Sequence, residues 1–400
     1  MKRAIAAAAA LLLLMPAGTV RAAEDIPEGF SLKYEIKDKK VTVTGCTGSD
    51  SMLMIPSEIE GMPVTAVAEN AFSGNTDIAI CILPDSLVTV GARAFSTCPN
   101  LCNLSLGKNV SSIGDYAFTA CPALFDISVS KDNSTYSNID GSLYMNGDSL
   151  LLYAGGADAK IYDKTKTIGK GAFFGKAEVV SVDIPESVTT IDDHAFSGCL
   201  SLKSVDIPDS VTKLGKGCFM SCSSLESVSF GKSVKAVPEN CFHSCNSLKN
   251  VSLTDSITSI GEDAFYSCTW LGELYIPSSV TAIGKDAVGR RYDVRSSSSE
   301  NISDFVIKGK PDTAAEKYAK EYGIAFESSS VKKGDVNGDG YTDAVDASAV
   351  LAEYARISSD KSAVFTSAQK QAADWNGDGI TDAVDASGIL AEYARLSSGK

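Results

Sequence analysis

Hydrophobic positions recur along most of this chain with a period of 23 residues. Each period opens with a phenylalanine after a small residue, and aliphatic side chains follow at alternate positions, as at Val205 and Ile207. This alternation predicts a short strand with one face inward. A second short extended piece follows, and a glycine permits the next turn. The marker phenylalanines are Phe72, Phe95, Phe118, Phe173, Phe196, Phe219, Phe242 and Phe265, and Val288 takes the next place.

A single unit of this kind cannot bury its own apolar face, so the pattern predicts stacked units with parallel strands. The gap from Phe118 to Phe173 is 32 residues longer than one period, which predicts nine units with one insertion at about 130–163. The repeat, approximately AFxxCxxLxxVxIPxSVTxIG, resembles the BspA-like class of leucine-rich repeats over residues 51–290. The resemblance implies a mainly β fold, a parallel leucine-rich-repeat solenoid of about nine 23-residue coils. The insertion looks like a hairpin often found in that family, and its Asn146-Gly147 pair suits a tight turn.

Both ends of a solenoid expose strand edges that need a cover. Residues 23–50 contain the alternating stretch FSLKYEIKDKKVTVTGC, which predicts an N-terminal capping hairpin. Residues 291–328 end in a strand–helix–strand pattern and resemble the closing unit of the same family. A short polar linker at 329–332 then leads to the last segment of the chain.

Six of the eleven cysteines stand three residues after a marker phenylalanine and form one column inside the turns. A small, weakly polar residue fills such a position well, so most of these cysteines are predicted to be reduced structural thiols. Neighbouring rungs of the column could also approach disulfide range, and a bonded pair stays open as an alternative.

The first 22 residues combine Lys2 and Arg3 with an apolar stretch too short to span a bilayer, and they end at Ala22 in a small-x-small site. They predict a signal peptide at 1–22, hence a secreted, extracellular protein, and no membrane span is predicted elsewhere. The hydrophobic content of 44% is ordinary for a folded soluble protein. The formal net charge of −14 would repel polyanions, so nucleic acid is excluded as a partner.

Sequence motifs for catalysis are missing. The two histidines, His194 and His243, lie in different repeats without a nucleophile or acid partner near them in the sequence. There is no GxSxG, no HExxH and no phosphate-cradling glycine loop. A surface role is predicted for both histidines, and the chain is predicted not to be an enzyme. A hydrolase of peptides or glycans is the less favoured alternative.

Two acidic segments near the end of the chain repeat each other at a distance of 39 residues. A calcium loop needs oxygen ligands at positions 1, 3, 5, 7, 9 and 12 and a glycine at position 6 for the sharp turn. Gly340 and Gly379 occupy position 6, and a helix is predicted after each loop, near Ala347–Arg356 and Ala386–Arg395. The predicted ligands, with carbonyl oxygens at position 7, are Asp335, Asn337, Asp339, Tyr341, Asp343 and Asp346 in the first loop and Asp374, Asn376, Asp378, Ile380, Asp382 and Asp385 in the second.

The loops depart from an EF-hand, because position 12 is aspartate and each loop is predicted to have only the exiting helix. A loop with one helix, duplicated, resembles a type I dockerin over residues 333–400. The resemblance implies a small all-α domain with two calcium ions that docks onto a cohesin module of a scaffold protein, as in the polysaccharide-degrading cellulosome at the cell surface. In dockerins the partner contacts loop positions 10 and 11 and later helix residues. These are Ala344, Val345, Leu351, Ala352 and Arg356 in the first copy and Ala383, Val384, Leu390, Ala391 and Arg395 in the second.

The two sets are identical, so either copy could face the same partner. The alternative is that the apolar residues beside the loops are buried inside the domain. The solenoid surface is predicted to bind a protein. Its outward strand positions are mostly small and polar, with Tyr275 and the nearby Trp270 as the aromatic exceptions, so the C-terminal coils are the predicted contact. The alternatives are that both aromatics cover the sheet's end, that the ligand is a polysaccharide or cell-surface glycan, or that the protein inhibits a protease.

Overall fold

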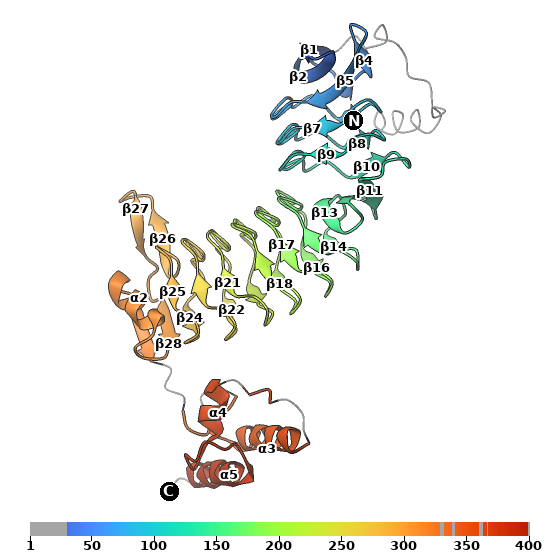
Figure 1. Ribbon diagram of the computed structural model, residues 1–400. Helices are drawn as coiled ribbons and strands as arrows, with labels where there is room; N and C mark the ends of the chain where they lie inside the picture. Colours follow the sequence, from blue (N-terminus) through green and yellow to red (C-terminus); the bar gives the residue numbers. More distant parts are fainter. Residues whose placement is uncertain (1–29, 329–331, 338–340, 360–362, 366, 399–400) are drawn as a thin grey trace.

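The computed structural model describes residues 30–328, 332–337, 341–359, 363–365 and 367–398. The predicted signal peptide, most of the predicted linker, and positions 4 to 6 of the first loop lie outside these residues. Figure 1 shows a curved stack of short strands through most of the chain, followed by a group of helices. Among the helices described, none combines the length and the apolarity that crossing a bilayer requires.

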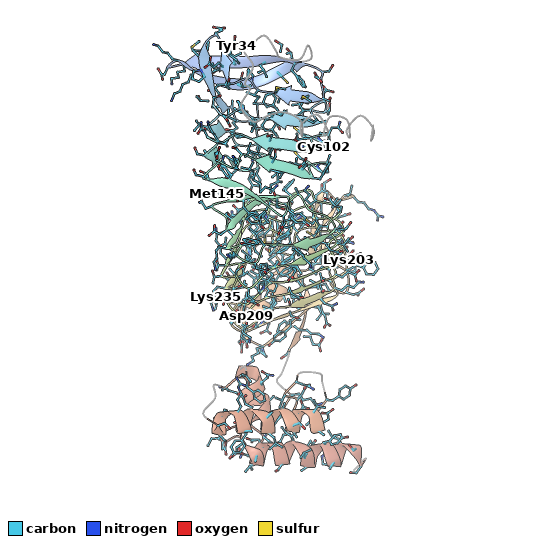
Figure 2. All side chains as sticks on the ribbon, turned by 90° about the vertical axis from the view of Figure 1, so that its right-hand side faces the viewer. Tyr34, Cys102, Met145, Lys203, Asp209 and Lys235 are labelled. Carbon is cyan, nitrogen blue, oxygen red and sulfur yellow. The ribbon has the colours of Figure 1, made fainter. Side chains whose placement is uncertain are left out.

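The stack contains two ladders of short strands, and most neighbouring strands of a ladder pair in parallel across one repeat, as Val205 does with Val228. Lys203 directly precedes a strand of one ladder and Lys235 a strand of the other, and Figure 2 shows these two lysines on opposite sides of the stack. One ladder comprises β3 (Met52–Met54), β6 (Ile80–Ile82), β8 (Asn103–Leu106), β10 (Asp126–Val129), β14 (Asp158–Lys160), β16 (Ser181–Asp183), β18 (Ser204–Asp206), β20 (Ser227–Ser229), β22 (Asn250–Ser252), β24 (Glu273–Ile276), β28 (Val306–Gly309) and β29 (Ala325–Ser328). The other comprises β2 (Lys40–Gly48), β5 (Met62–Val67), β7 (Thr89–Val90), β9 (Ser112–Ile113), β13 (Ser149–Leu152), β15 (Thr167–Ile168), β17 (Thr190–Ile191), β19 (Lys213–Leu214), β21 (Ala236–Val237), β23 (Ser259–Ile260) and β25 (Ala282–Ile283).

The insertion is larger than the predicted hairpin. Strands β11 (Tyr136–Ile139), β12 (Ser142–Met145) and β13 pair antiparallel as two successive hairpins, with turns at Asp140-Gly141 and at the predicted Asn146-Gly147. Strands β13 and β14 then pair in parallel with β15 and β16, so the insertion also supplies a coil of its own. The fold is a mainly β parallel solenoid of about 13 turns of about 23 residues. The predicted count of nine is too low, because strands of the insertion and of both caps extend the ladders.

Further strands and one helix lie at the two ends of the solenoid. Strand β1 (Phe30–Lys37) pairs antiparallel with β2, and β2 begins the second ladder by pairing with β5, against which the short β4 (Glu58–Ile59) also lies. At the other end, helix α2 (Ala314–Tyr322) connects β28 to β29. A further hairpin of β26 (Arg290–Asp293) and β27 (Ser298–Asn301) precedes this unit.

The core is built from columns of identical side chains. The ring of Phe219 lies between those of Phe196 and Phe242, with centroids 5.1 and 5.4 Å away and planes within a few degrees of parallel. All eleven cysteines lie in the described part of the chain and are free thiols. Those of the column donate to a carbonyl of the preceding coil, as the Cys222 thiol does to Phe196 at 3.2 Å. Burial raises the pKa of the Cys245 thiol well above its ordinary value, so it stays protonated and inert.

Glycine is required where the turn of one coil meets the backbone of the coil before it. A Cβ on Gly215 would lie 2.3 Å from the backbone nitrogen of Asp193. We expect Gly215→Ala to lower the free energy of unfolding by roughly 1–3 kcal/mol, the usual cost of overpacking, and urea unfolding followed by circular dichroism measures this. Gly272→Ala is the matched control, because a Cβ there meets no atom within 4 Å. Equal losses in the two variants would contradict the steric explanation.

Candidate metal-binding and docking site

Three helices frame the two acidic loops: α3 (Ala344–Ser358), α4 (Ser367–Ala373) and α5 (Ala383–Ser397). Helices α3 and α5 begin three residues earlier than predicted, because the aspartate at loop position 9 caps each of them. Asp382 accepts the amide N–H of Val384 at 2.7 Å, and Asp385 in turn accepts the amide of Asp382. Asp343 and Asp346 make the same capping box in the first loop.

The prediction that neither loop has an entering helix is wrong for the second loop, which α4 precedes directly. The segment SAQKQAA contains good helix formers, but it is too short to show a hydrophobic period. The predicted ligands of the second loop lie between this helix and α5.

Backbone amides hold the second loop in a tight turn. The two carboxylate oxygens of Asp374 accept the amides of Gly377 at 2.7 Å and of Gly379 at 3.0 Å. Gly379 has a φ of 81°, the left-handed conformation for which glycine at position 6 was predicted. Asp378 accepts the amide of Ile380. The aspartates at positions 1 and 5 therefore order the loop and keep further oxygen lone pairs.

The position-12 aspartates are fully buried, with 0% of Asp346 and of Asp385 exposed. One oxygen of Asp385 accepts the amides of Trp375 and Asn376, and the other accepts that of Asp382. Asp346 accepts the amide of Val336 at the corresponding place. Each loop thus closes around a buried carboxylate at its last position.

The donor set fits calcium by chemical type. In the described residues no three His, Cys, Asp or Glu side chains come together as a metal-holding group, and the carboxylates accept amides of their own loop instead. Each segment nevertheless presents carboxylate, side-chain amide and main-chain carbonyl oxygens, which are the hard ligands that calcium prefers, and contains no sulfur or imidazole. Asp339 of the predicted set lies outside the described residues.

The predicted partner-binding residues lie at the surface in both copies. Val345 and Val384 are each 59% exposed, and Leu351 and Leu390 are 43% and 42% exposed. The alternative that the residues beside the loops pack inside the domain is therefore wrong. Sequence reasoning missed neighbours on the same helices, although their repetition was a signal. These exposed neighbours are Tyr354, Ile357, Tyr393 and Leu396.

Comparison with protein families assigns both parts of the chain. Six copies of the BspA type leucine rich repeat region match residues 55–150 and 166–292, more than half of the sequence. The chain belongs to the BspA-type leucine-rich repeat family. The model of the dockerin type I domain matches residues 333–391. Type I dockerins generally bind calcium, and this domain implies docking onto a cohesin, as leucine-rich repeats imply protein binding.

The solved structures to which this chain is similar include bacterial leucine-rich repeat proteins. A leucine rich cell surface protein from Faecalibacterium prausnitzii is 22% identical, with 69% of this chain and 97% of that chain covered and a TM-score of 0.34. A leucine-rich repeat protein from Eubacterium ventriosum is 19% identical, with coverages of 66% and 93% and a TM-score of 0.44. The search of curated proteins finds no match.

The two halves of the dockerin differ in core residues and agree at the predicted docking positions. Trp375 packs against Gly388, where a Cβ would lie 2.0 Å from the indole ring, and the corresponding pair in the first half is Val336 and Ala349. Val350 and Ile389 are both fully buried. The second half thus combines a larger ring with a smaller partner in the core, while the predicted docking residues are the same in both halves.

One charged position is used differently in the two halves of the dockerin. Glu353 is buried, and one of its oxygens accepts the amides of Val364 and Phe365. Its counterpart Glu392 is partly exposed and pairs with Arg395 at 2.7 Å. Glu353 therefore holds the segment between the two helices against α3.

In the repeat region, Trp270 is 67% exposed and Tyr275 39%, so both predicted contact residues reach solvent. The ammonium group of Lys249 lies 5.5 Å from the Trp270 ring. The predicted surface role of the histidines is wrong in one respect, because both are half-buried within the turns. His243 stacks on Tyr266, and burial lowers the pKa of its imidazole against the opposing effect of Asp263.

Acidification should destabilise the solenoid through His243. The unfolded chain takes up this proton near the ordinary pKa of about 6.5, whereas the folded protein takes it up only at a lower pH. The unfolded state then binds more protons, so stability falls as the pH drops from 6.5 toward the folded pKa. We expect a lower urea midpoint at about pH 5.5 than at pH 7.5, and a smaller drop in His243→Gln. An equal drop in both proteins would exclude this group as the cause.

Proposed function

We propose that this is an exported, non-catalytic protein that docks onto a scaffold cohesin through its dockerin and displays its solenoid for binding another protein. The observation that carries the proposal is that the same apolar side chains are exposed beside both acidic loops. Exposed apolar patches of this kind mark interaction surfaces. A secreted, cell-surface-attached complex is the setting that fits the predicted signal peptide.

Each loop would hold one calcium ion, two in total. The ligands would be Asp335, Asn337, Asp339, Tyr341, Asp343 and Asp346 in one loop and Asp374, Asn376, Asp378, Ile380, Asp382 and Asp385 in the other. When bound, calcium supplies positive charge to a segment with eleven acidic and six basic residues. Backbone amides hold the carboxylates of Asp374 and Asp385 in place, and these carboxylates would present their remaining lone pairs to the ion.

The docking face would consist of the residues at loop positions 10 and 11 and those about two and three turns along each helix. Titration of the full chain with type I cohesins, in calcium and in chelator, tests this function. Calcium-dependent binding to at least one cohesin is expected, and failure with every cohesin would overturn it. The face comprises Ala344, Val345, Leu351, Ala352 and Arg356, or Ala383, Val384, Leu390, Ala391 and Arg395.

Because the two faces carry the same residues, loss of one should be tolerated. We expect Val345→Gln with Leu351→Gln to change cohesin affinity by no more than about twofold, since the second face can still dock. The matched pair Val384→Gln with Leu390→Gln should behave alike, and all four changes together should abolish binding. Isothermal titration calorimetry measures each affinity. Complete loss from either pair alone would show that docking uses a single face.

The solenoid would bind its protein partner near the C-terminal coils. Trp270 and Tyr275 give this region exposed aromatic area next to the Lys249 ammonium, and aromatic residues dominate many interfaces. Capture of secreted proteins by the full chain, compared with Trp270→Ala, tests the location. A partner that both proteins retain equally would place the contact elsewhere.

A further inference from the structure

The core column of aromatic rings changes at the insertion, where two hollows open. Rings stack from Phe72 through Phe95 to Phe118, and beyond the insertion Tyr153 takes the next place against Phe173 at 4.4 Å. Hollows of about 230 and 280 Å³ lie beside the coils that flank this change. Figure 2 labels Met145, which lines the smaller one, at the level between the coils of Cys102 and Lys203.

The larger hollow is lined by aromatic rings and a guanidinium group. The rings of Tyr116 and Phe174 lie 6.2 and 6.5 Å from that of His194, tilted by 60° and 70°. The guanidinium carbon of Arg93 lies 5.8 Å from the centre of the Tyr116 ring. The coil between Tyr116 and His194 carries Gly171 here, and a Cβ would lie 2.9 Å from the Tyr116 ring. Because Gly171 has no side chain, the Tyr116 ring can lie close to the backbone of that coil.

His194 contributes a hydrogen-bond donor at this place. Its Nδ1 is buried without a hydrogen-bond partner in the described part of the chain, and it faces Gly217, where a Cβ would lie 2.7 Å away. A buried N–H without an acceptor costs more than a buried lone pair, so the tautomer with the proton on Nε2 fits this environment better than the one with the proton on Nδ1. The Nε2–H group is then the polar atom that His194 offers to a ligand.

The smaller hollow adds charges of both signs. It is lined by Asp115, Lys170 and Asp192, and the Lys170 ammonium lies 2.6 Å from an oxygen of Asp115. Tyr116 lines both hollows. Burial first and then Asp193 raise the pKa of its hydroxyl, which stays a neutral donor at neutral pH.

Taken together, the lining of the two hollows has no net charge. Arg93 and Lys170 oppose Asp115 and Asp192, and the hydroxyl of Thr97 adds a further polar group. An ionic ligand of either sign would lie against two groups of its own sign. A neutral ligand with many hydroxyl groups could use the donors and acceptors together and lay an apolar C–H face on the Tyr116 ring.

We propose that these two hollows form one binding site for a neutral oligosaccharide, with Tyr116 as the platform between two sugar rings. Their combined size is that of a site for a small ligand of about 300–1,000 Å³. The site lies on coils far from the dockerin in sequence and needs neither calcium nor a cohesin. It therefore goes beyond the docking function and does not depend on it.

Calorimetric titration of the full chain with cellotriose, xylotriose and mannotriose, and with trigalacturonate as the acidic counterpart, tests the proposal. We expect at least one neutral trisaccharide to bind, and Tyr116→Ala to weaken it by about tenfold or more through loss of the stacking face. Arg93 is exposed, so Arg93→Ala leaves the core intact, and this variant should bind the trisaccharide severalfold more weakly. Lys232→Ala is the matched control, since this lysine is 85% exposed on a distant coil, and it should bind as the wild type does.

Three results would overturn the proposal. These are no binding of any neutral trisaccharide at about 10 mM, binding of trigalacturonate alone, or binding that both Arg93→Ala and Tyr116→Ala leave unchanged. Cohesin affinity, measured on the same variants, should equal that of the wild type. A variant that loses sugar but keeps cohesin separates this site from the docking function.

Discussion

Removal of calcium should unfold the dockerin and abolish cohesin binding while the solenoid stays folded. Asp346 and Asp385 are fully buried, and further carboxylates crowd each loop, so the folded loops concentrate negative charge that needs a cation. Binding to the folded state alone stabilises it by about 2.7 kcal/mol per site at a hundredfold excess over Kd. Chelator should therefore remove helical circular dichroism and change the fluorescence of Trp375, which packs against Gly388.

Calorimetry on the same protein counts the ions. The wild type should take up two calcium ions, and Asp378→Ala in the second loop should take up one. Glu392→Gln is the control, because this partly exposed acid on α5 pairs with Arg395 outside the loop, and two ions are expected. Uptake of two ions by Asp378→Ala, or an unchanged helical signal in chelator, would contradict the coupling of metal and fold.

The repeat could be located from sequence because its parts are copied at a fixed distance. Val205 pairs with Val228 across one period, so a residue's number alone gives its neighbour in the next coil. The loop residues could be predicted from sequence as well, since the spacing of the ligand positions in a calcium loop is fixed. Gly379 has the left-handed conformation that this order requires.

The insertion could not be read in the same way, because it breaks the period. Tyr153 lies outside the repeat motif, yet its ring stacks on that of Phe173 as a marker phenylalanine of the preceding coil would. Lys176 stands in the cysteine column, buried, with its ammonium group donating to the carbonyl of Leu124 at 2.9 Å. Only the fold shows that this carbonyl, on the coil across the insertion, is within reach of a lysine.

The candidate sugar site was missed for a related reason. Arg93, Tyr116 and His194 stand two residues before the marker phenylalanine of three different repeats, but they differ in chemical type, and in the repeat between Tyr116 and His194 this position is Gly171, which lacks a side chain. A glycine adds nothing to the pattern of hydrophobic positions, so the sequence does not indicate a hollow at Gly171. The short helix α4 was missed because seven residues make fewer than two full turns.

Phe219→Ala should destabilise the solenoid by about 3–5 kcal/mol, the range for deleting a buried phenylalanine ring. Phe219 is fully buried and stacks on a ring on either side, so the coils cannot close the cavity without moving both neighbours. Phe125→Ala is the matched control, because that ring is 63% exposed, and a change within about 0.5 kcal/mol is expected. Urea unfolding followed by circular dichroism in the β region compares the two.

The shape of the Phe219→Ala transition tests the architecture as well as the energy. In a solenoid each coil contacts only its neighbours, so a cavity in the middle weakens the coupling between the coils on its two sides. We expect the variant to unfold in two steps where the wild type unfolds in one, because the coils around Phe95 and those around Phe265 lie on opposite sides of the gap. A single transition shifted by less than about 1 kcal/mol would mean that the ring column is not the element joining the coils.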